Sequence, residues 1–405
     1  MLTESEPLFR RPLKHTPFHE RARALCQVDS FIPWAGYSTV DVFTTLEQEY
    51  FALRNTATLY DLSPMVKYRI GGPDAPRYLD RLLTRDVRRL SPGRVAYVLW
   101  CNDAGHLIDD GTLFRLGPEE YRLCTAEHQL DWLLDAGIGF DVQITEVTED
   151  TAALALQGPT ACALLQAAGI VGIERLKPFD LAPVELRAPA GGACDMLISR
   201  TGFTGDLGYE LWVSPADAEA LWDALMQVGS SRGLRPMGSR ALNLARIEAG
   251  LLLPHLDFIP AERTLRTGTA RSPLELGLQR FVHFDKGHFN GRRALLAEER
   301  RGVSRRLVGL DIEGEKPAHN ALIYADRGAR RQVGSVTSAC WSPTCKRNIA
   351  FAMLDAPHFQ LGNSLWAEIY LNRELVWERR MVRARVVERT FFAPERRRTT
   401  PPADH

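Results

Sequence analysis

Two adjacent carboxylates, Asp109 and Asp110, are candidates for acid–base chemistry. They follow a turn at 102–105 that ends the strand predicted at 97–101, and the return strand that carries them completes a predicted hairpin. Neighbouring residues on a strand point to opposite faces, so at most one of these carboxylates can face a given cavity. We therefore expect one aspartate to be structural. From spacing alone, a hairpin whose aspartates only accept bonds from backbone amides is the more common outcome.

A glycine-rich segment at 200–210 is a second candidate. Gly202, Gly205 and Gly208 would let the backbone approach another group closely. The segment lacks the Gly-Lys-Ser/Thr ending of a phosphate loop, and it precedes a predicted strand where a phosphate loop would open a helix. We therefore do not expect a nucleoside triphosphate. Glu210, just beyond the loop, could hold a polar N–H donor or simply lie on an edge strand in water.

The third candidate is the helical segment 245–251, which runs into an apolar loop and His255. Its Arg246 and Glu248 could pair with each other or face solvent, which is the usual fate of such charges.

Metal ligands are sparse in the sequence. The seven cysteines are odd in number and scattered, which is typical of reduced thiols, and Cys340 with Cys345 has no second ligand pair nearby. His15 and His19 have helical ligand spacing, but Pro17 between them works against a shared helix face. We interpret this pair as surface residues and expect no metal.

The elements that position these candidates follow from periodicity. Strand–turn–helix patterns at 66–83 and 153–168, and a strand at 209–213 leading into a helix, predict a two-layer α+β region over 1–300. Short strand candidates at close spacing over 306–392 predict a separate C-terminal β-barrel domain. The charged stretch 298–306 is expected to be a linker, and 393–405 a frayed polar tail.

Composition excludes several classes of partner. Lys and Arg number 50 against 50 Asp and Glu in 405 residues, so the electrostatic argument for nucleic acid or an anionic membrane is absent. No apolar run is long enough for a spanning helix, and the polar N-terminus lacks the apolar core of a secretory signal. The sequence therefore predicts a cytoplasmic protein with no nucleic-acid or membrane partner.

Together these segments resemble the aminomethyltransferase family typified by the T-protein of the glycine cleavage system, which includes tetrahydrofolate-dependent demethylases. The resemblance covers most of the chain, and its further motifs in family order are 59–65, 272–278, 284–292 and 333–344. It implies three domains around a central channel that holds tetrahydrofolate.

By this resemblance, Asp110 corresponds to the essential acid of the family. Folate contacts are implied for Tyr97, Asp110, Phe203, Glu210 and Arg246. Glu210 would grip the pterin N–H groups, Phe203 replaces a family tyrosine, and the charge of Arg246 would suit the glutamate tail.

The chain departs from a T-protein after the 245–250 helix. Residues 252–260 read LLPHLDFIP where T-proteins usually read LYGNDMDE, Pro64 replaces a family histidine, and Phe114 stands in place of a tyrosine. A lipoyl carrier protein is therefore not expected as a partner. These changes resemble the demethylase branch, which moves an intact methyl group onto N5 of tetrahydrofolate to give 5-methyltetrahydrofolate.

The methyl donor is expected at the channel mouth, near Trp34, Tyr37, Trp100, His106 and His255. An aryl methyl ether, as in aromatic catabolism, would need aromatic walls and a group that stabilises the departing phenolate, and His255 or Tyr37 could serve. We favour the ether because two histidines accompany the aromatic residues, and we count His255 with Asp110 as catalytic. Ordinary core packing explains each aromatic residue equally well.

Three alternatives stay open. A methylated ammonium, such as a methylated glycine, or an S-methyl donor would make the protein a different demethylase, and Trp34, Trp100 and Asp110 could imitate a cation-binding cage. A genuine T-protein would transfer an aminomethyl group. A non-catalytic folate-binding relative is disfavoured because His288 stands where those relatives carry a signature cysteine.

Overall fold

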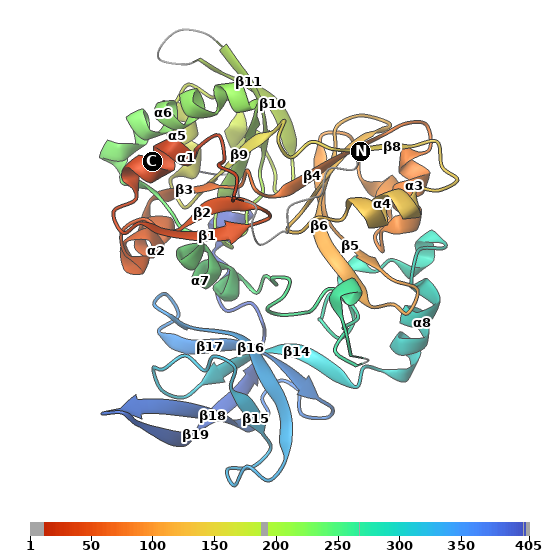
Figure 1. Cartoon of the computed structure of the whole chain (residues 1–405), viewed down its shortest axis with the longest axis vertical. Coiled ribbons are helices and arrows are strands. Elements are labelled where there is room, and N and C mark those ends of the chain that lie inside the picture. Colours follow the sequence, from red (N-terminus) through yellow and green to blue (C-terminus); the bar gives the residue numbers. More distant parts are fainter. Residues whose placement is uncertain (1–11, 188–192, 267, 400, 402–405) are drawn as a thin grey trace.

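The computed structural model describes residues 12–187, 193–266, 268–399 and 401. Three lobes surround a central region: two mixed lobes from the first part of the chain, and a β-barrel below them in Figure 1. The α+β class and the C-terminal barrel are thus as expected. Among the described residues, no helix is both long and apolar enough to cross a membrane.

The first lobe is built on a six-stranded sheet in the order β10-β11-β12-β9-β3-β13. Only the β13–β3 pair is parallel. The strands are β3 (Ala57–Asp61), β9 (Ala152–Gln157), β10 (Leu181–Arg187), β11 (Ala193–Ser199), β12 (Gly208–Val213) and β13 (Leu234–Pro236). A hairpin of β1 (Ser30–Trp34) and β2 (Tyr37–Val42) lies beside it, with helices α1 (His19–Leu25), α2 (Leu46–Asn55), α5 (Ala161–Ala167), α6 (Ala218–Gly229) and α7 (Ser239–Ala249).

Both faces of this sheet are covered. Every residue of β9 and β12 is buried. Leu154 and Leu211 pack in one apolar cluster that includes α5 and α6, whereas Ala153 and Trp212 pack in another that includes α2 and α7. Helix starts follow local signals: the Thr45 side chain accepts a bond from the Gln48 amide at the start of α2.

The second lobe has a five-stranded sheet in the order β5-β6-β7-β4-β8. Its strands are β4 (Val66–Gly71), β5 (Arg94–Cys101), β6 (Leu107–Arg115), β7 (Glu120–Thr125) and β8 (Gln143–Glu146), with helices α3 (Ala75–Leu82) and α4 (Leu130–Ala136). Tyr78, Leu79 and Leu82 form the buried stripe of α3. The predicted strand–turn–helix units are therefore β4–α3 here and β9–α5 in the first lobe.

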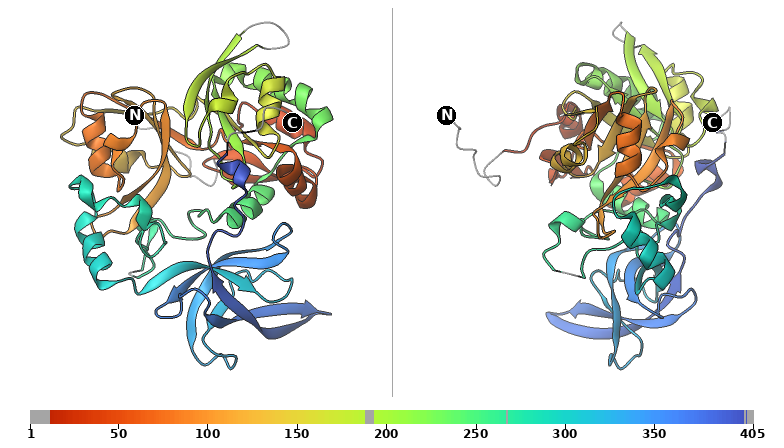
Figure 2. Two further views of the ribbon diagram at one scale, coloured as in Figure 1. Left: turned by 180° about the vertical axis from the view of Figure 1, so that it is seen from behind. Right: turned by 90° about the vertical axis from the view of Figure 1, so that its right-hand side faces the viewer.

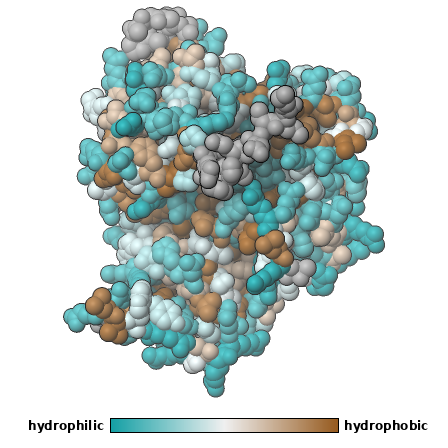
Figure 3. All heavy atoms as spheres, viewed as in Figure 1, coloured by the Kyte–Doolittle hydropathy of each residue, from teal (hydrophilic) through white to brown (hydrophobic). Residues whose placement is uncertain are grey.

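The third lobe is a closed barrel in the order β14-β17-β16-β15-β18-β19. Its strands are β14 (Arg305–Ile312), β15 (Leu322–Tyr324), β16 (Gln332–Ser342), β17 (Arg347–Asp355), β18 (Ser364–Arg373) and β19 (Val376–Val387). Helix α8 (Arg292–Arg301) occupies part of the predicted linker and packs under the β5–β6 turn, where Leu295 lies against Gly105. The β18–β19 turn projects at the lower left of Figure 3 and exposes Leu375, Val376 and Trp377.

The C-terminal segment differs from its prediction. After β19, the chain runs from the barrel back to the first lobe, as the left view of Figure 2 shows. Arg396 forms hydrogen bonds to both carboxylate oxygens of Asp206, and Thr399 accepts one from Arg200. The described part of the predicted frayed tail is thus held by specific contacts, which a polar composition does not reveal.

Candidate functional site

Asp110 and Tyr97 form a hydrogen-bonded pair on the β5–β6 hairpin. The register pairs Leu99 with Asp110 and Tyr97 with Thr112, so all four side chains share one face of the sheet. The Tyr97 hydroxyl donates to Asp110 Oδ2 at 2.5 Å, and the Tyr97 ring meets Phe281 edge-on at 4.8 Å. Burial raises the pKa of Asp110 to about 6, against the lowering effect of the Tyr97 bond. Asp110 can therefore exchange a proton near neutral pH.

Asp109 points the other way. It is fully buried; its Oδ1 accepts the Asp110 amide at 2.8 Å, and its Oδ2 accepts Gln129 Nε2 at 3.0 Å. Burial, and secondarily the charge of Asp110, raise the pKa of Asp109. Strand alternation thus separates the two carboxylates as expected, and Asp109 belongs to the interior of the second lobe.

Glu210 lies on β12 within a chain of hydroxyl groups. Thr201 Oγ1 donates to Glu210 Oε2 at 2.6 Å, Ser199 Oγ lies 3.5 Å from the same oxygen, and Trp212 Nε1 donates to Ser199 at 3.2 Å. Glu210 Oε1 has no hydrogen-bond partner among the described residues. Burial raises the pKa of Glu210 to about 7, and the two hydroxyls oppose that rise.

The two carboxylates belong to facing sheets. Phe114, on the same face of β6 as Asp110, meets Trp212 edge-on at 5.1 Å, and Trp212 shares a face of β12 with Glu210. Burial raises the pKa of Cys124 on β7, and the charge of Glu210 adds to that rise, so the two side chains lie near each other. Asp110 and Glu210 therefore border the junction between the first and second lobes. Phe203 lies half-buried in the loop before β12.

Arg246 is fully buried and fully engaged. It forms an ion pair with Asp257, donates from Nη2 to Ser338 at 2.8 Å and from Nε to Asn243 at 2.9 Å, and also bonds the Leu251 carbonyl. These contacts join α7 to the following loop and the barrel. The predicted contact of Arg246 with an anionic tail thus loses its physical basis, since Asp257 already neutralises the charge. Glu248 pairs with Arg54 rather than with Arg246.

Arg389 is a candidate site residue that the sequence did not suggest. It follows the last barrel strand and donates to the carbonyls of Gly250 and Leu276. It also lies close enough to Tyr97 for its charge to lower the pKa of that hydroxyl partly, although burial raises this pKa overall. No local motif marks position 389, because only the return of the chain from the barrel brings it here.

Three of the predicted donor-site residues gather near one loop of the second lobe. Trp34 Nε1 donates to the Ala126 carbonyl at 3.1 Å, and His255 Nε2 lies 3.7 Å from Glu127 Oε1. Tyr37 pairs with Trp34 across the β1–β2 hairpin. His255 has a φ of 66°, an uncommon conformation for a non-glycine residue. Glu127 was missed because nothing in its surroundings along the chain suggests chemistry.

The other two predicted donor contacts lie elsewhere. Trp100 is fully buried with Tyr68 and Leu79 in the core of the second lobe, so the prediction that it contacts a donor is wrong. It pairs with Asp109 and shares its inward-facing side. His106 lies at the β5–β6 turn, where its amide donates to Asn102 Oδ1 at 3.0 Å. No described contact links it to Trp34, Tyr37 or His255.

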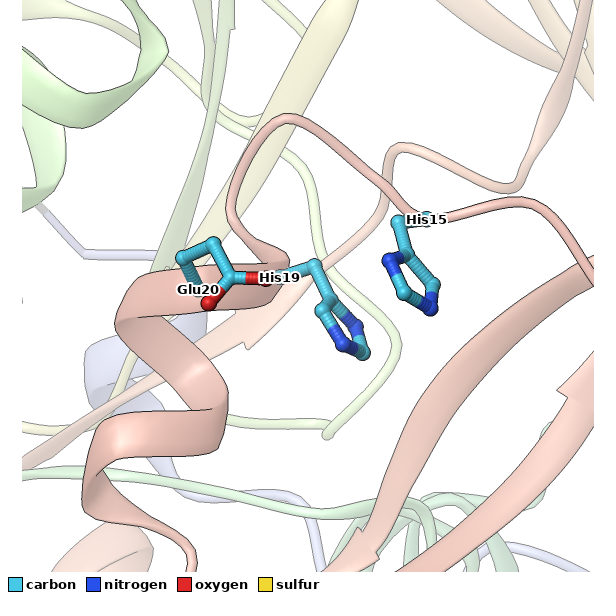
Figure 4. Close-up of side chains that lie close together, drawn as sticks. All are labelled: His15, His19 and Glu20. Atoms are coloured by element: carbon cyan, nitrogen blue, oxygen red, sulfur yellow. The ribbon is translucent and has the colours of Figure 1, made fainter.

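His15, His19 and Glu20 form one group whose ligand atoms all lie within 4.8 Å of one another. The centroids of the two imidazole rings lie 3.6 Å apart, and the ring planes differ by 8°. Figure 4 shows the two rings side by side. Parallel rings direct their in-plane lone pairs side by side, so one ring would have to turn before both could ligate one ion. His15 is exposed but His19 is buried, so the interpretation of this pair as surface residues is wrong for His19 alone.

Comparison with known proteins adds to this geometry. The GCVT N-terminal domain model matches residues 18–286, and the model for the glycine cleavage T-protein C-terminal barrel domain matches 305–392. An aminomethyltransferase from Caldanaerobacter subterraneus subsp. tengcongensis is 34% identical over 387 residues, covering 94% of this chain and 96% of the relative. A trimethylamine-oxide aldolase from Ruegeria pomeroyi is 33% identical over 362 residues, covering 86% of this chain and 44% of that protein.

A solved structure of an aminomethyltransferase has a similar fold. The glycine cleavage system aminomethyltransferase T from Bartonella henselae superposes with a TM-score of 0.80 at 25% identity, over 94% of this chain and 98% of that one. The two family models together cover both mixed lobes and the barrel of the present chain. The chain therefore belongs to the aminomethyltransferase (GCVT) family.

Proposed function

We propose that this protein transfers a methyl group from a small methylated donor onto N5 of tetrahydrofolate, giving 5-methyltetrahydrofolate. The observation that carries the proposal is the Tyr97–Asp110 pair: a carboxylate with a pKa of about 6, held at 2.5 Å by a tyrosine hydroxyl on a rigid hairpin. Methylation of a secondary amine releases a proton, and such a carboxylate is suited to take it.

The residues present fit tetrahydrofolate. Glu210 is a mostly buried residue whose Oε1 has no partner among the described residues and can accept from the N–H groups of a pterin. Phe203 and Phe281 offer apolar rings, and Arg389 brings a cation to the Tyr97 side. When bound, tetrahydrofolate supplies the amine that accepts the one-carbon group.

The chain's own contribution is mainly positioning and proton handling. Glu210 orients the acceptor from β12, and Tyr97 holds the Asp110 carboxylate in place. Asp110 is mostly ionised at pH 7 because its pKa is about 6, so it can accept a proton from the reacting amine. Its negative charge also stabilises positive charge that develops at that amine during transfer.

An aryl methyl ether is the donor that the sequence suggested first. His255 is half-exposed beside the second lobe, and burial raises the pKa of Tyr37, which keeps its hydroxyl protonated. Both could donate hydrogen bonds to a departing phenolate. Trp34, close to the same loop, would supply an aromatic wall.

A methylated ammonium is a second candidate donor, and Glu127 specifically favours it. This carboxylate lies beside His255 and next to the Trp34 contact, where it would oppose a phenolate but attract a cation. The relative named for trimethylamine oxide, an N-methylated compound, points the same way. The relatives named aminomethyltransferase leave aminomethyl transfer from a lipoyl carrier as a further alternative, against which the 252–260 segment argues.

One experiment separates these activities. The protein is incubated with tetrahydrofolate and, in separate reactions, methoxyaromatics, methylated glycines, trimethylamine oxide, sulfonium compounds, and an aminomethylated lipoyl carrier. Folate products are resolved by liquid chromatography. We expect 5-methyltetrahydrofolate with one donor class, absent in Asp110→Asn. Methylene-tetrahydrofolate and ammonia from the lipoyl carrier alone, or no product with any donor, would overturn the proposal.

A further inference from the structure

The C-terminal segment 388–399 lies against the loop that precedes Glu210. We propose that this segment positions the 200–208 loop and thereby sets the affinity of the protein for folate, with Arg396 as the positioning residue. The inference rests on the proposed function, because it assigns a role to that same binding site. Arg396 and Thr399 lie beyond the barrel-domain match, which ends at 392.

The segment is anchored along its length. The amides of Phe391 and Phe392 both donate to the Glu248 carbonyl at 2.9 Å. The Phe392 ring covers the Arg54 guanidinium at 4.7 Å, and the Phe391 ring stacks on Phe351 of the barrel. These contacts fix the path of the segment across α7 before it reaches the loop.

The segment then holds the loop at two points. Arg396 Nε and Nη2 bond the two Asp206 oxygens at 2.6 and 2.8 Å, a bidentate pair that constrains orientation as well as distance. At the start of the loop, Arg200 Nη2 donates to the Thr399 carbonyl at 2.5 Å. The carboxylate of Asp206 is fully buried and is shared with Arg54 at 3.2 Å.

The held loop contains the groups assigned to the pterin. Thr201, next to Arg200, donates to Glu210, and Phe203 lies between Arg200 and Asp206. Further side-chain support of the loop comes from Gln157, which accepts from Thr204 Oγ1 at 2.9 Å and donates to the Thr201 carbonyl at 3.2 Å, and from Arg54, which donates to the Thr204 carbonyl at 3.1 Å. Loss of the Arg396 bond would leave Asp206 with Arg54 as its one guanidinium partner among the described residues. The loop would then sample positions in which Phe203 and Thr201 no longer face the site. The expected result is weaker folate binding with little effect on the methyl-transfer step itself.

The segment offers a matched control. Arg398 is two residues from Arg396, carries the same charge, is exposed, and has no side-chain hydrogen bond or ion pair among the described residues. We compare Arg396→Ala, Arg396→Lys and Arg398→Ala in the full chain. Tetrahydrofolate affinity is measured by calorimetry, kcat and both KM values by product assay, and protection of the 200–208 amides by hydrogen exchange.

We expect Arg396→Ala to weaken tetrahydrofolate binding roughly tenfold and to raise its KM by a similar factor, with kcat at saturation and the donor KM within about twofold of wild type. Loop exchange should accelerate in the absence of folate. Arg396→Lys should restore part of the affinity, and Arg398→Ala should match wild type.

Several results would overturn the inference. Unchanged affinity in Arg396→Ala, with or without a lower melting temperature, would leave Arg396 a purely structural residue. An equal loss of tetrahydrofolate affinity in Arg398→Ala would show that the effect comes from the change in net charge and not from the Arg396–Asp206 contact. Failure of the proposed function looks different: wild-type protein would then bind no tetrahydrofolate, whereas a failed positioning role leaves wild-type binding intact.

Discussion

Two groups of buried carboxylates in this protein differ in their partners. At the lobe junction that we assign to folate, Asp110 and Glu210 accept bonds from the hydroxyls of Tyr97, Thr201 and Ser199. Where α7 meets the other lobes, Asp206, Glu248 and Asp257 pair with the guanidinium groups of Arg54, Arg396 and Arg246. Burial is similar in both regions, so the partner decides what each carboxylate can do.

A hydroxyl partner leaves a buried carboxylate free to take up a proton, whereas a guanidinium partner commits it to the ionised form. The pKa values of Asp110 and Glu210 rise to about 6 and about 7 because burial outweighs their hydrogen bonds. The first region can therefore serve proton transfer and recognition of N–H donors. The second region holds the lobes together.

The largest effect is expected at Asp110. Asp110→Asn should lower turnover about a thousandfold, because an amide cannot accept the proton. Asp109→Asn should cost less than about tenfold, since Asp109 faces the core and Gln129. Wild-type kcat at saturating tetrahydrofolate should rise with pH and level off above about 6, where Asp110 is ionised. Steady-state kinetics from pH 5 to 8 test this; equal losses in the two variants would contradict the distinction between the faces of β6.

The next largest effect is on the stability of the protein, in the region where buried carboxylates pair with arginines. Arg54→Met should destabilise the protein by roughly 3–5 kcal/mol, because it leaves Glu248 buried without its guanidinium and Asp206 with Arg396 alone. The control is Arg347→Met, which removes a half-exposed pair with Asp311 and should cost below about 1 kcal/mol. Urea unfolding at pH 7 measures both. Similar losses of unfolding free energy in the two variants would mean that burial does not make the Arg54 pairs more important for stability than the half-exposed Arg347–Asp311 pair.

Local patterns predicted much of the fold but only part of the site. Alternation located most barrel strands, yet β15, with residues 322–324 only, is too short for any periodicity. Alternation also separated Asp109 from Asp110. It could not indicate that Arg246 is occupied by Asp257, or that Trp100 faces the core, because both depend on which elements pack together. Arg389 and Glu127 were missed for the same reason, as the groups they approach lie far away in sequence.

Glu210 allows the comparison to be tested through pH. A carboxyl whose pKa is raised in the folded state binds more protons there than in the unfolded chain, so it lowers stability as pH rises from about 4.5 to about 7. Glu210→Gln should remove this dependence and be more stable than wild type at pH 8, by up to roughly 3 kcal/mol. Thermal unfolding at pH 5 and pH 8 measures it.

The same variant should bind tetrahydrofolate about tenfold to a hundredfold more weakly, because an amide replaces the charged acceptor of the pterin N–H groups. Thr201→Val is the companion change: it removes a bond to Glu210 but keeps the carboxylate, so it should raise the pKa of Glu210 further and lose less affinity. If Glu210→Gln changes neither the pH dependence of stability nor the affinity for tetrahydrofolate, then Glu210 neither titrates with a raised pKa nor binds the pterin.

The smallest effect is expected at Glu127, which is nearly one-third exposed and near the donor side of the site. Glu127→Gln should raise the KM of a methylated ammonium donor about two- to fivefold and leave the KM of an aryl ether unchanged or lower, since the lost charge attracts only cations. Salt should shrink the difference, because exposed charges are screened. Glu120→Gln, an equal charge change on β7, is the control. If both variants shift the ammonium KM equally, the attraction belongs to the whole surface of the lobe, and the argument for a cationic donor at His255 fails.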